Sequence, residues 1–288
     1  MNKLNILIAG CGAVGCELGR QLTSMKCFNV WGLRRNISKL PSGVHPIQGD
    51  LFQEEGLGQW PEHLDYVVYS AASDGSSEEQ YRRAYISGLQ NILSRLTKKN
   101  DHPKRILFTS STSTFHQNDG EWVNEISETC PIKLNGKVML EAEALLRNSP
   151  FPTTAIRFGG IYGPGRNRLV NRVLKGEGCP KEPLIYSNRI HQKDCAGIIA
   201  HLIRRDMDNL PVDNLYLGTD SDPATTHDVL QWLGQQLDVT LDNVNYPSPP
   251  SSQQGGNKRC SNQRLMETGY KFYFPDFKAG YSGLLHDR

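Results

Sequence analysis

The chain has 288 residues, of which 38% are hydrophobic and 22% are charged, a composition typical of a soluble globular protein. Its length allows one large domain or two modest ones. The formal net charge is only +2, so the sequence offers no general attraction to nucleic acid or to an acidic membrane surface. We therefore expect a small-molecule partner, with neither nucleic acid nor a membrane among its targets.

Cysteine usage argues against a disulfide framework. The seven cysteines include no C-x-x-C pair and are odd in number, so neither disulfides nor a zinc site is supported, and we expect no metal. Buried, reduced thiols in a cytoplasmic protein are the default expectation. The N-terminal apolar run Ile6–Ala9 is shorter than the ~7–15 residues of a signal-peptide core. No other apolar run approaches the ~18 residues of a membrane span.

Short apolar runs rich in β-branched and aromatic residues recur along the chain and predict buried strands. Patterns typical of helices separate most of these runs, and this alternation indicates a parallel α/β sheet. We expect a Rossmann-type, doubly wound parallel sheet with a smaller C-terminal subdomain. The predicted strands are residues 4–10, 28–33, 66–72, 105–111, 153–160 and 214–219.

The alternation weakens after Pro164, which suggests two domains. We expect residues 1–163 to form the dinucleotide-binding domain, with a strand and helix near 190–219 returning to it. Residues 164–288 would form most of a smaller subdomain on the substrate side. An alternative is that the aromatic C-terminal tail only pads the sheet. Helices are expected near 169–175, 226–237 and 261–268, and a Pro- and Ser-rich loop at 247–256.

The first predicted strand runs directly into the turn GCGAVG and then into a helix. The turn needs a first glycine so the chain can reverse, a second so the backbone can approach a pyrophosphate, and a third so that helix and strand pack closely. The phosphates would bind the free N–H groups at the helix start. A glycine-rich turn without a ligand is the alternative. The predicted cofactor-binding residues here are Gly10, Gly12, Ala13, Val14 and Gly15.

The end of the second predicted strand bears on the choice of cofactor. Sites that prefer NAD carry an acid about 20 residues after the turn, which binds the ribose 2′-OH. This chain has no acid between Glu17 and Asp50 and instead offers Arg34 and Arg35, whose planar guanidinium groups suit a 2′-phosphate. NADP is therefore favoured, and NAD remains an alternative. The two arginines could also be solvated residues at a strand end.

Further motifs follow in a fixed order: GDLF (49–52), SAA (70–72), YISGLQNIL (85–93), FTSSTSTF (108–115), RFGGIYGPGR (157–166) and IHQKDCAG (190–197). In this order they resemble the extended branch of the short-chain dehydrogenase/reductase superfamily, in the grouping called NAD-dependent epimerase/dehydratase. The resemblance runs nearly end to end, and RFGGIYGPGR is its most specific part. It implies further cofactor contacts at Asp50, Leu51, Ala71, Ala72, Lys137, Phe158 and Ile161.

The resemblance also implies a catalytic set, which is incomplete. The family uses a Ser or Thr that binds the substrate oxygen, a proton-transferring tyrosine, and a lysine four residues later on the same helix face. Ser111 and Lys137 match two of these positions, but the tyrosine position is Lys133. An atypical subgroup without the standard active-site residues is the nearest description. Lys137 could also be a solvated cation in the first turn of its helix.

Two other residues are open candidates for proton transfer. Tyr162 lies in the RFGGIYGPGR loop and His116 follows the serine strand by five residues, although each could instead be structural. We therefore expect an NAD(P)-binding protein that acts as an NADP-linked oxidoreductase or epimerase on a small carbonyl or sugar-like substrate. The alternative is a non-catalytic NADP(H)-binding sensor or regulatory protein. The oligomeric state is open, and a homodimer is one of the alternatives.

Overall fold

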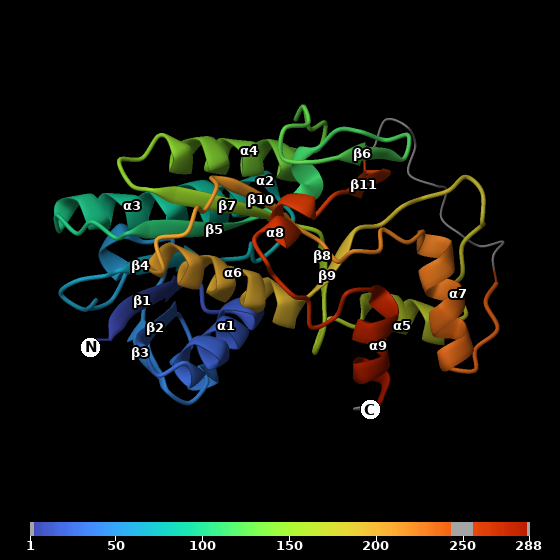
Figure 1. Ribbon diagram of the computed structural model, residues 1–288, viewed down its shortest axis with the longest axis horizontal. Coiled ribbons are helices and arrows are strands. Elements are labelled where there is room, and N and C mark those ends of the chain that lie inside the picture. The colour runs from blue at the N-terminus through green and yellow to red at the C-terminus, as the bar shows by residue number, and fades with distance from the viewer. Residues whose placement is uncertain (1–2, 243–255, 287–288) are drawn as a thin grey trace. The chain divides into compact units, whose positions relative to one another are not determined.

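The computed structural model describes residues 3–242 and 256–286 (Figure 1). The chain divides into two compact units, each assembled from three segments. The first unit comprises Met1–Ser111, Leu134–Arg157 and Cys195–Tyr216, and the second comprises Thr112–Lys133, Phe158–Asp194 and Leu217–Arg288. These bounds differ from the expected division at residue 163, because residues 112–133 and 158–163 group with the C-terminal part of the chain.

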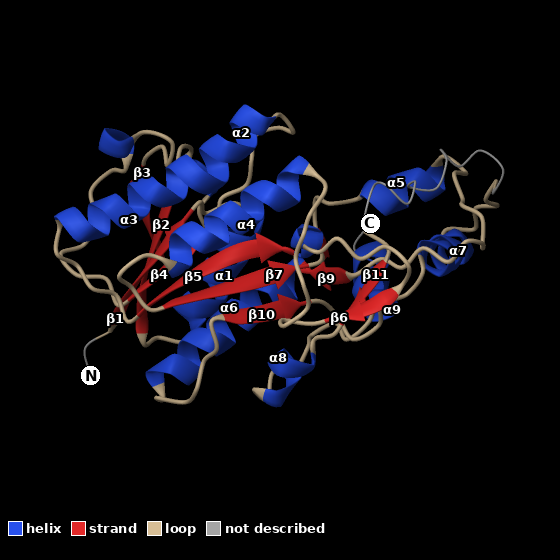
Figure 2. Ribbon diagram, turned by 90° about the horizontal axis from the view of Figure 1, so that it is seen from above, coloured by secondary structure: helices blue, strands red, loops and turns tan. Residues whose placement is uncertain are grey.

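A seven-stranded sheet organises the first unit, and it is doubly wound as expected. Hydrogen bonds join β3 to β2, β2 to β1, β1 to β4 and β4 to β5 in parallel, and Figure 2 shows the arrows of β5, β7 and β10 pointing the same way. In sheet order the strands are β10 (Leu215–Gly218), β7 (Thr153–Phe158), β5 (Arg105–Ser111), β4 (Tyr66–Tyr69), β1 (Leu4–Ala9), β2 (Phe28–Arg34) and β3 (Val44–Gln48).

All six predicted strands are therefore present, and β3 is the strand of this sheet that the sequence analysis missed. Its sequence VHPIQ buries only Val44 and Ile47 and contains Pro46. A proline in a strand usually marks an edge, and β3 is indeed the edge strand beside β2. The reversal of strand order between β1 and β4 creates the position at which open α/β sheets bind ligands, outside the carboxyl ends of the strands.

Helices cover both faces of this sheet (Figure 1). On one side lie α3 and α4, whose buried apolar residues join the strands in one core, and on the other lie α1 and α6. In the helix that carries Lys137, the residues Met139, Ala142 and Leu146 are buried while Lys137 itself is exposed. The helices are α1 (Ala13–Ser24), α2 (Glu78–Arg82), α3 (Gly88–Lys98), α4 (Leu134–Arg147) and α6 (Gln192–Met207).

The second unit contains two short parallel strand pairs and four helices within the described residues. The three helices expected near 169–175, 226–237 and 261–268 are present as α5, α7 and α8, and α9 forms the C-terminal helix. Of the predicted loop 247–256, only Gly256 is described. The elements are β6 (Glu121–Val123) with β11 (Lys258–Cys260), β8 (Gly160–Tyr162) with β9 (Arg189–His191), α5 (Arg168–Leu174), α7 (Thr226–Gln236), α8 (Gln263–Glu267) and α9 (Phe277–His286).

Asp194 fixes the aromatic C-terminal segment within the second unit. This buried carboxylate accepts hydrogen bonds from the Tyr270 hydroxyl (2.9 Å) and from the backbone N–H groups of Tyr273 (2.8 Å) and Phe274 (3.0 Å). The ring of His191 lies 4.3 Å, centroid to centroid, from that of Phe274. The motif IHQKDCAG thus contributes a structural anchor for the tail.

None of the helices in the described ranges is both long enough and apolar enough to cross a membrane. Among the same residues, no group of three His, Cys, Asp or Glu side chains is placed to hold a metal ion.

Candidate cofactor-binding site

Three glycines shape the turn between β1 and α1, each for a different reason. Gly10 has a φ of +85°, and a Cβ placed there would lie 2.5 Å from the backbone nitrogen of Ala71. Glycine at this position therefore allows the carboxyl ends of β1 and β4 to approach each other. At Gly15 a Cβ would lie 2.9 Å from Cγ2 of Ile8, so the third glycine allows α1 to pack closely on β1.

Gly12 differs from both, because space is open around it. A Cβ on Gly12 would find only the carbonyl oxygen of Gly10, at 3.9 Å, and both Gly12 and Ala13 are exposed. Gly12 is also the N-cap of α1, with no side-chain hydrogen bond to the first turn and no acidic residue in that turn. The turn thus leaves donor groups and room for an anion, which fits the pyrophosphate of a dinucleotide.

Arg34 and Arg35 follow at the carboxyl end of β2, as expected, and the structure pairs each of them. The Arg34 Nη1 lies 3.5 Å from both the Cys16 Sγ and the carbonyl oxygen of Lys39. Arg35 donates two hydrogen bonds to the Asp74 carboxylate, at 2.9 and 2.7 Å. This pairing raises the pKa of Arg35 and lowers the pKa of Asp74, chiefly through the hydrogen bonds. Sequence reasoning missed Asp74, which lies 39 residues away.

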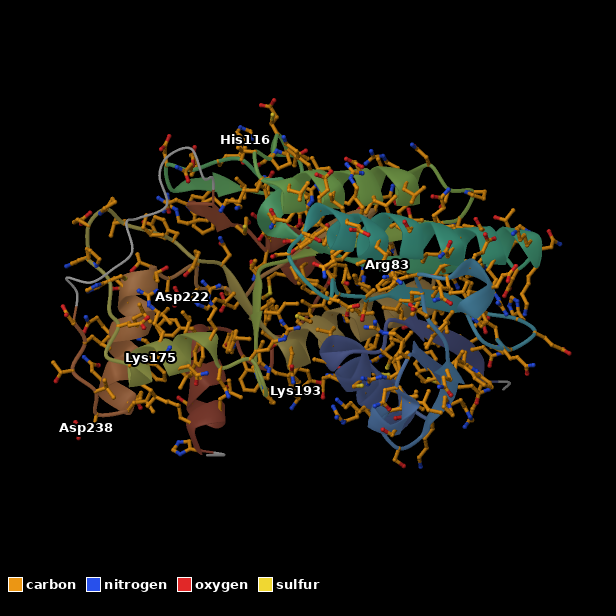
Figure 3. All side chains as sticks on the ribbon, turned by 180° about the vertical axis from the view of Figure 1, so that it is seen from behind. Arg83, His116, Lys175, Lys193, Asp222 and Asp238 are labelled. Carbon is orange, nitrogen blue, oxygen red and sulfur yellow. The ribbon has the colours of Figure 1, made fainter. Side chains whose placement is uncertain are left out.

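A third guanidinium group lies nearby and was also missed. Arg83 begins a π-helical turn, η3 (Arg83–Ser87), between α2 and α3, and its side chain is labelled in Figure 3. The guanidinium carbons of Arg83 and Arg35 lie 4.9 and 5.8 Å from the centroid of the Phe52 ring. The Arg83 Nη2 is also 4.0 Å from the Asp50 carboxylate. The π-turn is a signal that could have drawn attention to Arg83, because such turns are frequent at functional sites.

The other predicted contacts in the first unit lie on the same strand ends. Asp50 is half-buried and accepts a hydrogen bond of 3.0 Å from the Phe52 N–H, whereas Leu51 belongs to the hydrophobic core. Ala71 is nearly buried against Gly10, and Ala72 is exposed. Asp50, Ala71 and Ala72 therefore lie just beyond the carboxyl ends of β3 and β4, on the side of the sheet where open α/β folds bind ligands.

A buried charged network supports Ser111 and Lys137. Glu143 of α4 accepts hydrogen bonds from the Ser110 hydroxyl (2.6 Å) and from Nε and Nη2 of Arg157 in β7 (2.9 and 2.7 Å). All three side chains are at most 6% exposed. Ser110 directly precedes Ser111 in β5, and Lys137 lies on the same helix as Glu143. The network thus joins β5, α4 and β7, the strand and helix that carry Ser111 and Lys137 among them.

The remaining site predictions fall in the second unit. Lys133, at the tyrosine position, is exposed one residue before α4 begins. Phe158 is buried at the end of β7, and Ile161 is half-buried in β8. His116, which is labelled in Figure 3, lies in the segment that follows β5. None of these observations assigns a proton donor.

Tyr162 is a packing residue in this structure. Its ring stacks on Tyr281 at 4.5 Å and meets the His191 ring edge-on at 5.3 Å. Its hydroxyl lies against Gly280, where any Cβ would collide with it. Burial raises the pKa of Tyr162, because the phenolate would be poorly solvated there. These contacts favour the structural interpretation of Tyr162 over a catalytic one.

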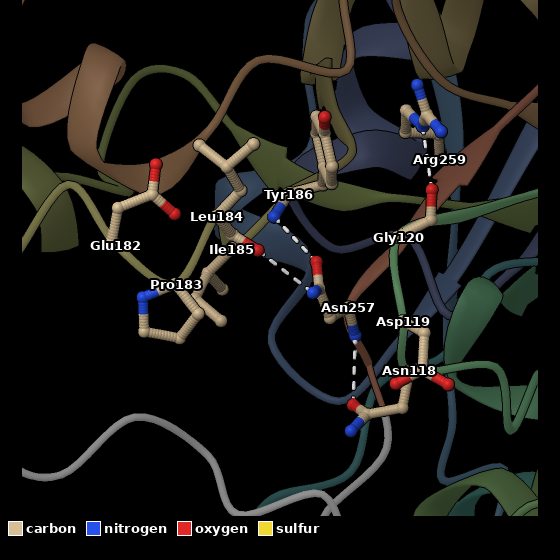
Figure 4. Close-up of a pocket in the computed structure, with 10 residues that line it drawn as sticks. All are labelled: Asn118, Asp119, Gly120, Glu182, Pro183, Leu184, Ile185, Tyr186, Asn257 and Arg259. Atoms are coloured by element: carbon tan, nitrogen blue, oxygen red, sulfur yellow. Dashed lines mark hydrogen bonds between the residues drawn. The ribbon is translucent and has the colours of Figure 1, made fainter.

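A cavity of about 530 Å³ in the second unit was not anticipated (Figure 4). Asn257 holds one wall, because its side chain accepts from the Tyr186 N–H (2.8 Å) and donates to the Leu184 carbonyl (2.9 Å). Another wall carries Arg259, which donates to the Gly120 carbonyl (2.7 Å) and stacks over Tyr186 at 4.8 Å. The cavity therefore presents polar groups on a rigid frame.

Comparison with known proteins agrees with this geometry. A family model described as NAD(P)H-binding matches residues 10–206. The chain belongs to this family. The matched range begins at Gly10 and contains Arg34, Arg35, Ser111 and Lys137. A nicotinamide dinucleotide is therefore its cofactor, and the match leaves open which one.

Individual relatives of this NAD(P)H-binding protein point the same way. A solved structure described as a candidate NAD-dependent epimerase/dehydratase from Methylobacillus flagellatus is 36% identical, with a TM-score of 0.81, and the match covers 99% of this chain and 98% of that one. The human epimerase family protein SDR39U1 (isoform 2), solved with NADPH, is 19% identical with a TM-score of 0.78, covering 99% and 100% of the two chains, and shows a shared fold.

A curated relative is the sterol-4-alpha-carboxylate 3-dehydrogenase ERG26 of Candida albicans, 28% identical over 187 residues, or 57% of this chain and 52% of that protein. The chain spans about half the length of the first two curated relatives it matches. Together the comparisons confirm the extended or atypical short-chain dehydrogenase/reductase assignment. The chain is an NAD(P)-binding protein of the epimerase/dehydratase type.

Proposed function

We propose that this chain binds NADP(H) in preference to NAD(H) and exchanges a hydride with a small carbonyl or sugar-like substrate. The observation that carries the choice of cofactor is the pair of guanidinium groups, Arg34 and Arg35, at the carboxyl end of β2. No carboxylate stands on β2 to bind a ribose 2′-OH. The relative from Methylobacillus flagellatus is described as NAD-dependent and the human neighbour was solved with NADPH, so relatives do not decide this point.

The ion pair between Arg35 and Asp74 is too weak to prevent a 2′-phosphate from binding to Arg35. Both side chains are about half exposed, and such surface pairs contribute only about 0.2–1 kcal/mol. A hydrogen bond between a guanidinium and a phosphate contributes about 1.5–3 kcal/mol. A 2′-phosphate can therefore displace Asp74 from Arg35 with a net gain.

The cofactor proposal is tested by titrating the protein with NADP⁺, NADPH, NAD⁺ and NADH and following the thermal midpoint and intrinsic fluorescence. We expect the two phosphorylated forms to bind at least about tenfold more tightly, as one charge-assisted hydrogen bond would give. Equal affinities for the phosphorylated and unphosphorylated forms would refute the role of the arginines.

Within this proposal the protein residues have distinct tasks. The nicotinamide ring supplies or accepts the hydride when the cofactor is bound. Ser111 would bind the substrate oxygen by a hydrogen bond, and Lys137 would bind the nicotinamide ribose. The buried Glu143 network would hold both residues in place through β5 and α4. The step without an assigned group is protonation of the substrate oxygen, since Lys133 stands where the family has its tyrosine.

That gap favours a second candidate function, a non-catalytic sensor of NADP(H). A positioned acid typically accelerates a reaction by ~10²–10⁴-fold, so the wild-type protein should turn over carbonyl substrates slowly if it lacks one. Lys133→Tyr should raise the rate of NADPH oxidation with aldehydes, quinones or sugar nucleotides. Lys133→Phe is the matched control, because it adds the ring without the hydroxyl.

The outcomes separate the two functions. Acceleration by Lys133→Tyr alone would indicate that a binding site lacks only its acid. Fast wild-type turnover that is lost in Ser111→Ala and Lys137→Ala would establish the enzyme and require another proton donor. Fast turnover that survives both substitutions would show that the active site has been placed wrongly.

A further inference from the structure

Two cysteines lie close to the start of α1. Cys11 belongs to the glycine turn before the helix, and Cys16 belongs to the helix itself. Cys11 stands between Gly10 and Gly12 and is fully buried, and Cys16 is the fourth residue of α1 and is 8% exposed. Their sulfur atoms are 4.0 Å apart. Cys11 directly precedes the N-cap Gly12, and Cys16 lies one turn into α1. A pair of apolar side chains commonly packs together at these two positions.

Arg34 distinguishes this pair from an inert apolar contact. Its Nη1 lies 3.5 Å from the Cys16 Sγ, and a guanidinium beside a sulfur favours the thiolate. The hydrogen bond with Cys11 lowers the pKa of Cys16, and the charge of Arg34 adds to this against the effect of burial. The same hydrogen bond, together with burial, raises the pKa of Cys11. The contact with Arg34 therefore favours Cys16 over Cys11 as the nucleophile of the pair.

We propose that Cys11 and Cys16 form a reversible disulfide in the presence of a hydroperoxide, and that this disulfide weakens binding of NADP(H). The inference rests on the proposed cofactor site at the same turn. It assigns to the two thiols a regulatory task that the glycine motif alone does not require.

The oxidation of the two cysteines takes place in two steps. The Cys16 thiolate attacks one peroxide oxygen, the O–O bond breaks, and Cys16 sulfenic acid forms as the alcohol or water leaves with a proton. The Cys11 thiol then attacks the Cys16 sulfur, the S–O bond breaks, and water leaves. The two cysteines lose two electrons and two protons in total, and the hydroperoxide is reduced. A dithiol such as dithiothreitol reverses the reaction by exchange.

The disulfide would affect the cofactor through the backbone of the turn. An S–S bond is about 2.05 Å long, so the two sulfurs must approach by about half of their present separation. Cys11 directly precedes Gly12, whose backbone would face the pyrophosphate. In the disulfide, Cys16 can also no longer carry a thiolate charge beside Arg34. Both changes alter groups proposed to bind NADP(H).

The coupling must be reciprocal. If the disulfide lowers the affinity for NADP⁺ by some factor, bound NADP⁺ must disfavour the disulfide by the same factor. The oxidised cofactor is the appropriate probe, since it does not consume peroxide.

The experiment treats the reduced protein with hydrogen peroxide, removes the oxidant, and maps the cysteine-containing peptides by mass spectrometry. The expected product is a Cys11–Cys16 linkage that has lost two hydrogen atoms, together with NADPH binding weakened by about tenfold, within the usual range of coupling between sites. Dithiothreitol should restore both, and saturating NADP⁺ during oxidation should slow the linkage.

Matched variants isolate the pair. Cys11→Ala and Cys16→Ala should each retain NADPH binding under reducing conditions and lose its sensitivity to peroxide. Cys27→Ala removes an exposed cysteine from the same unit and should remain sensitive like the wild type. Alanine is used because a serine hydroxyl at the buried Cys11 position would lack solvation.

The possible failures are distinguishable. A reduced protein that binds no nicotinamide cofactor overturns the proposed function. A protein that binds NADPH but leaves Cys11 and Cys16 unlinked after peroxide overturns the inference alone. A linkage without any change in NADPH affinity, or oxidation of Cys16 without participation of Cys11, overturns it as well.

Discussion

The start of α1 and the start of α7 meet the same physical requirement in opposite ways. Both helices begin with backbone N–H groups that lack a partner within the helix. At α7 the Thr225 side chain accepts a hydrogen bond from the Asp228 N–H (3.1 Å), and Asp228 adds a negative charge to the first turn. At α1 the cap is Gly12, which has no side chain to accept anything, and the first turn has no acid.

The difference shows which of the two helices is capped by a side chain of the protein itself. At α7 the Thr225 side chain caps one free donor and Asp228 complements the helix dipole, and both stabilise the fold. The donors of α1 are left for a molecule that the chain does not supply, at the place where the glycine turn also leaves space. The missing cap makes the start of α1 less stable, but it leaves N–H groups available to a ligand.

Gly12→Val should have the largest effect on the cofactor site at the start of α1. Its φ of −83° is one that any residue adopts, and the new side chain would point into open space, so the protein should still fold. The valine would occupy the volume of the pyrophosphate, and we expect the loss of measurable NADPH binding. Calorimetric titration and circular dichroism measure the two effects separately. Gly283→Val is the control, since space is also open around that glycine. Unchanged NADPH affinity would contradict the assignment of the turn.

Arg35→Ala should have the next largest effect. Loss of one charge-assisted contact should weaken NADPH binding by about tenfold or more while NADH binding changes little. Arg20→Ala provides a close control, because Arg20 is equally exposed, at 59%, and is also paired with a carboxylate. The prediction fails if both variants alter NADPH affinity alike, or if NADH binding falls in parallel.

Thr225→Ala tests the self-capped helix. Removal of the cap should lower the free energy of unfolding by about 1 kcal/mol and leave cofactor affinity unchanged. Chemical denaturation followed by circular dichroism, with Thr225→Ser as the conservative control, measures the loss. A stability equal to that of the wild type would mean that the cap contributes nothing to α7.

Asp74→Asn should produce the smallest change, in the favourable direction. The carboxylate pairs with Arg35 and would repel a 2′-phosphate, so its neutralisation should tighten NADPH binding by the ~0.2–1 kcal/mol of an exposed ion pair. The effect should shrink as salt is added, because both groups are exposed. Tighter binding of NADH by the same factor would show that the 2′-phosphate is not involved.

Local sequence was sufficient to predict six of the seven strands of the sheet and the glycine turn. A strand, a glycine turn and a helix are adjacent in the chain, and each glycine performs a task set by the residues next to it. The same locality explains why Arg34 and Arg35 could be assigned to the end of β2. Residues that depend only on their neighbours in sequence were therefore the predictable ones.

Partners brought together by the fold were not predictable in this way. No local pattern joins Asp74 to Arg35, or Arg83 to Phe52, because each pair forms only when separate strand ends meet. The bonds from Asp194 to the aromatic tail span some 80 residues. Likewise, Cys11 and Cys16 were recognised only as members of an odd set until the turn brought their sulfurs together.

The order of the strands has a consequence for how the protein is made. In the finished sheet β7 lies between β5 and β10, yet roughly 60 residues separate the end of β7 from the end of β10, which a ribosome adds in about 3–12 s. During that interval the backbone groups on one side of β7 have no strand beside them, and such an edge is prone to pair with other chains. The nascent chain therefore passes through a stage in which β7 has an unpaired edge that a chaperone can protect from aggregation.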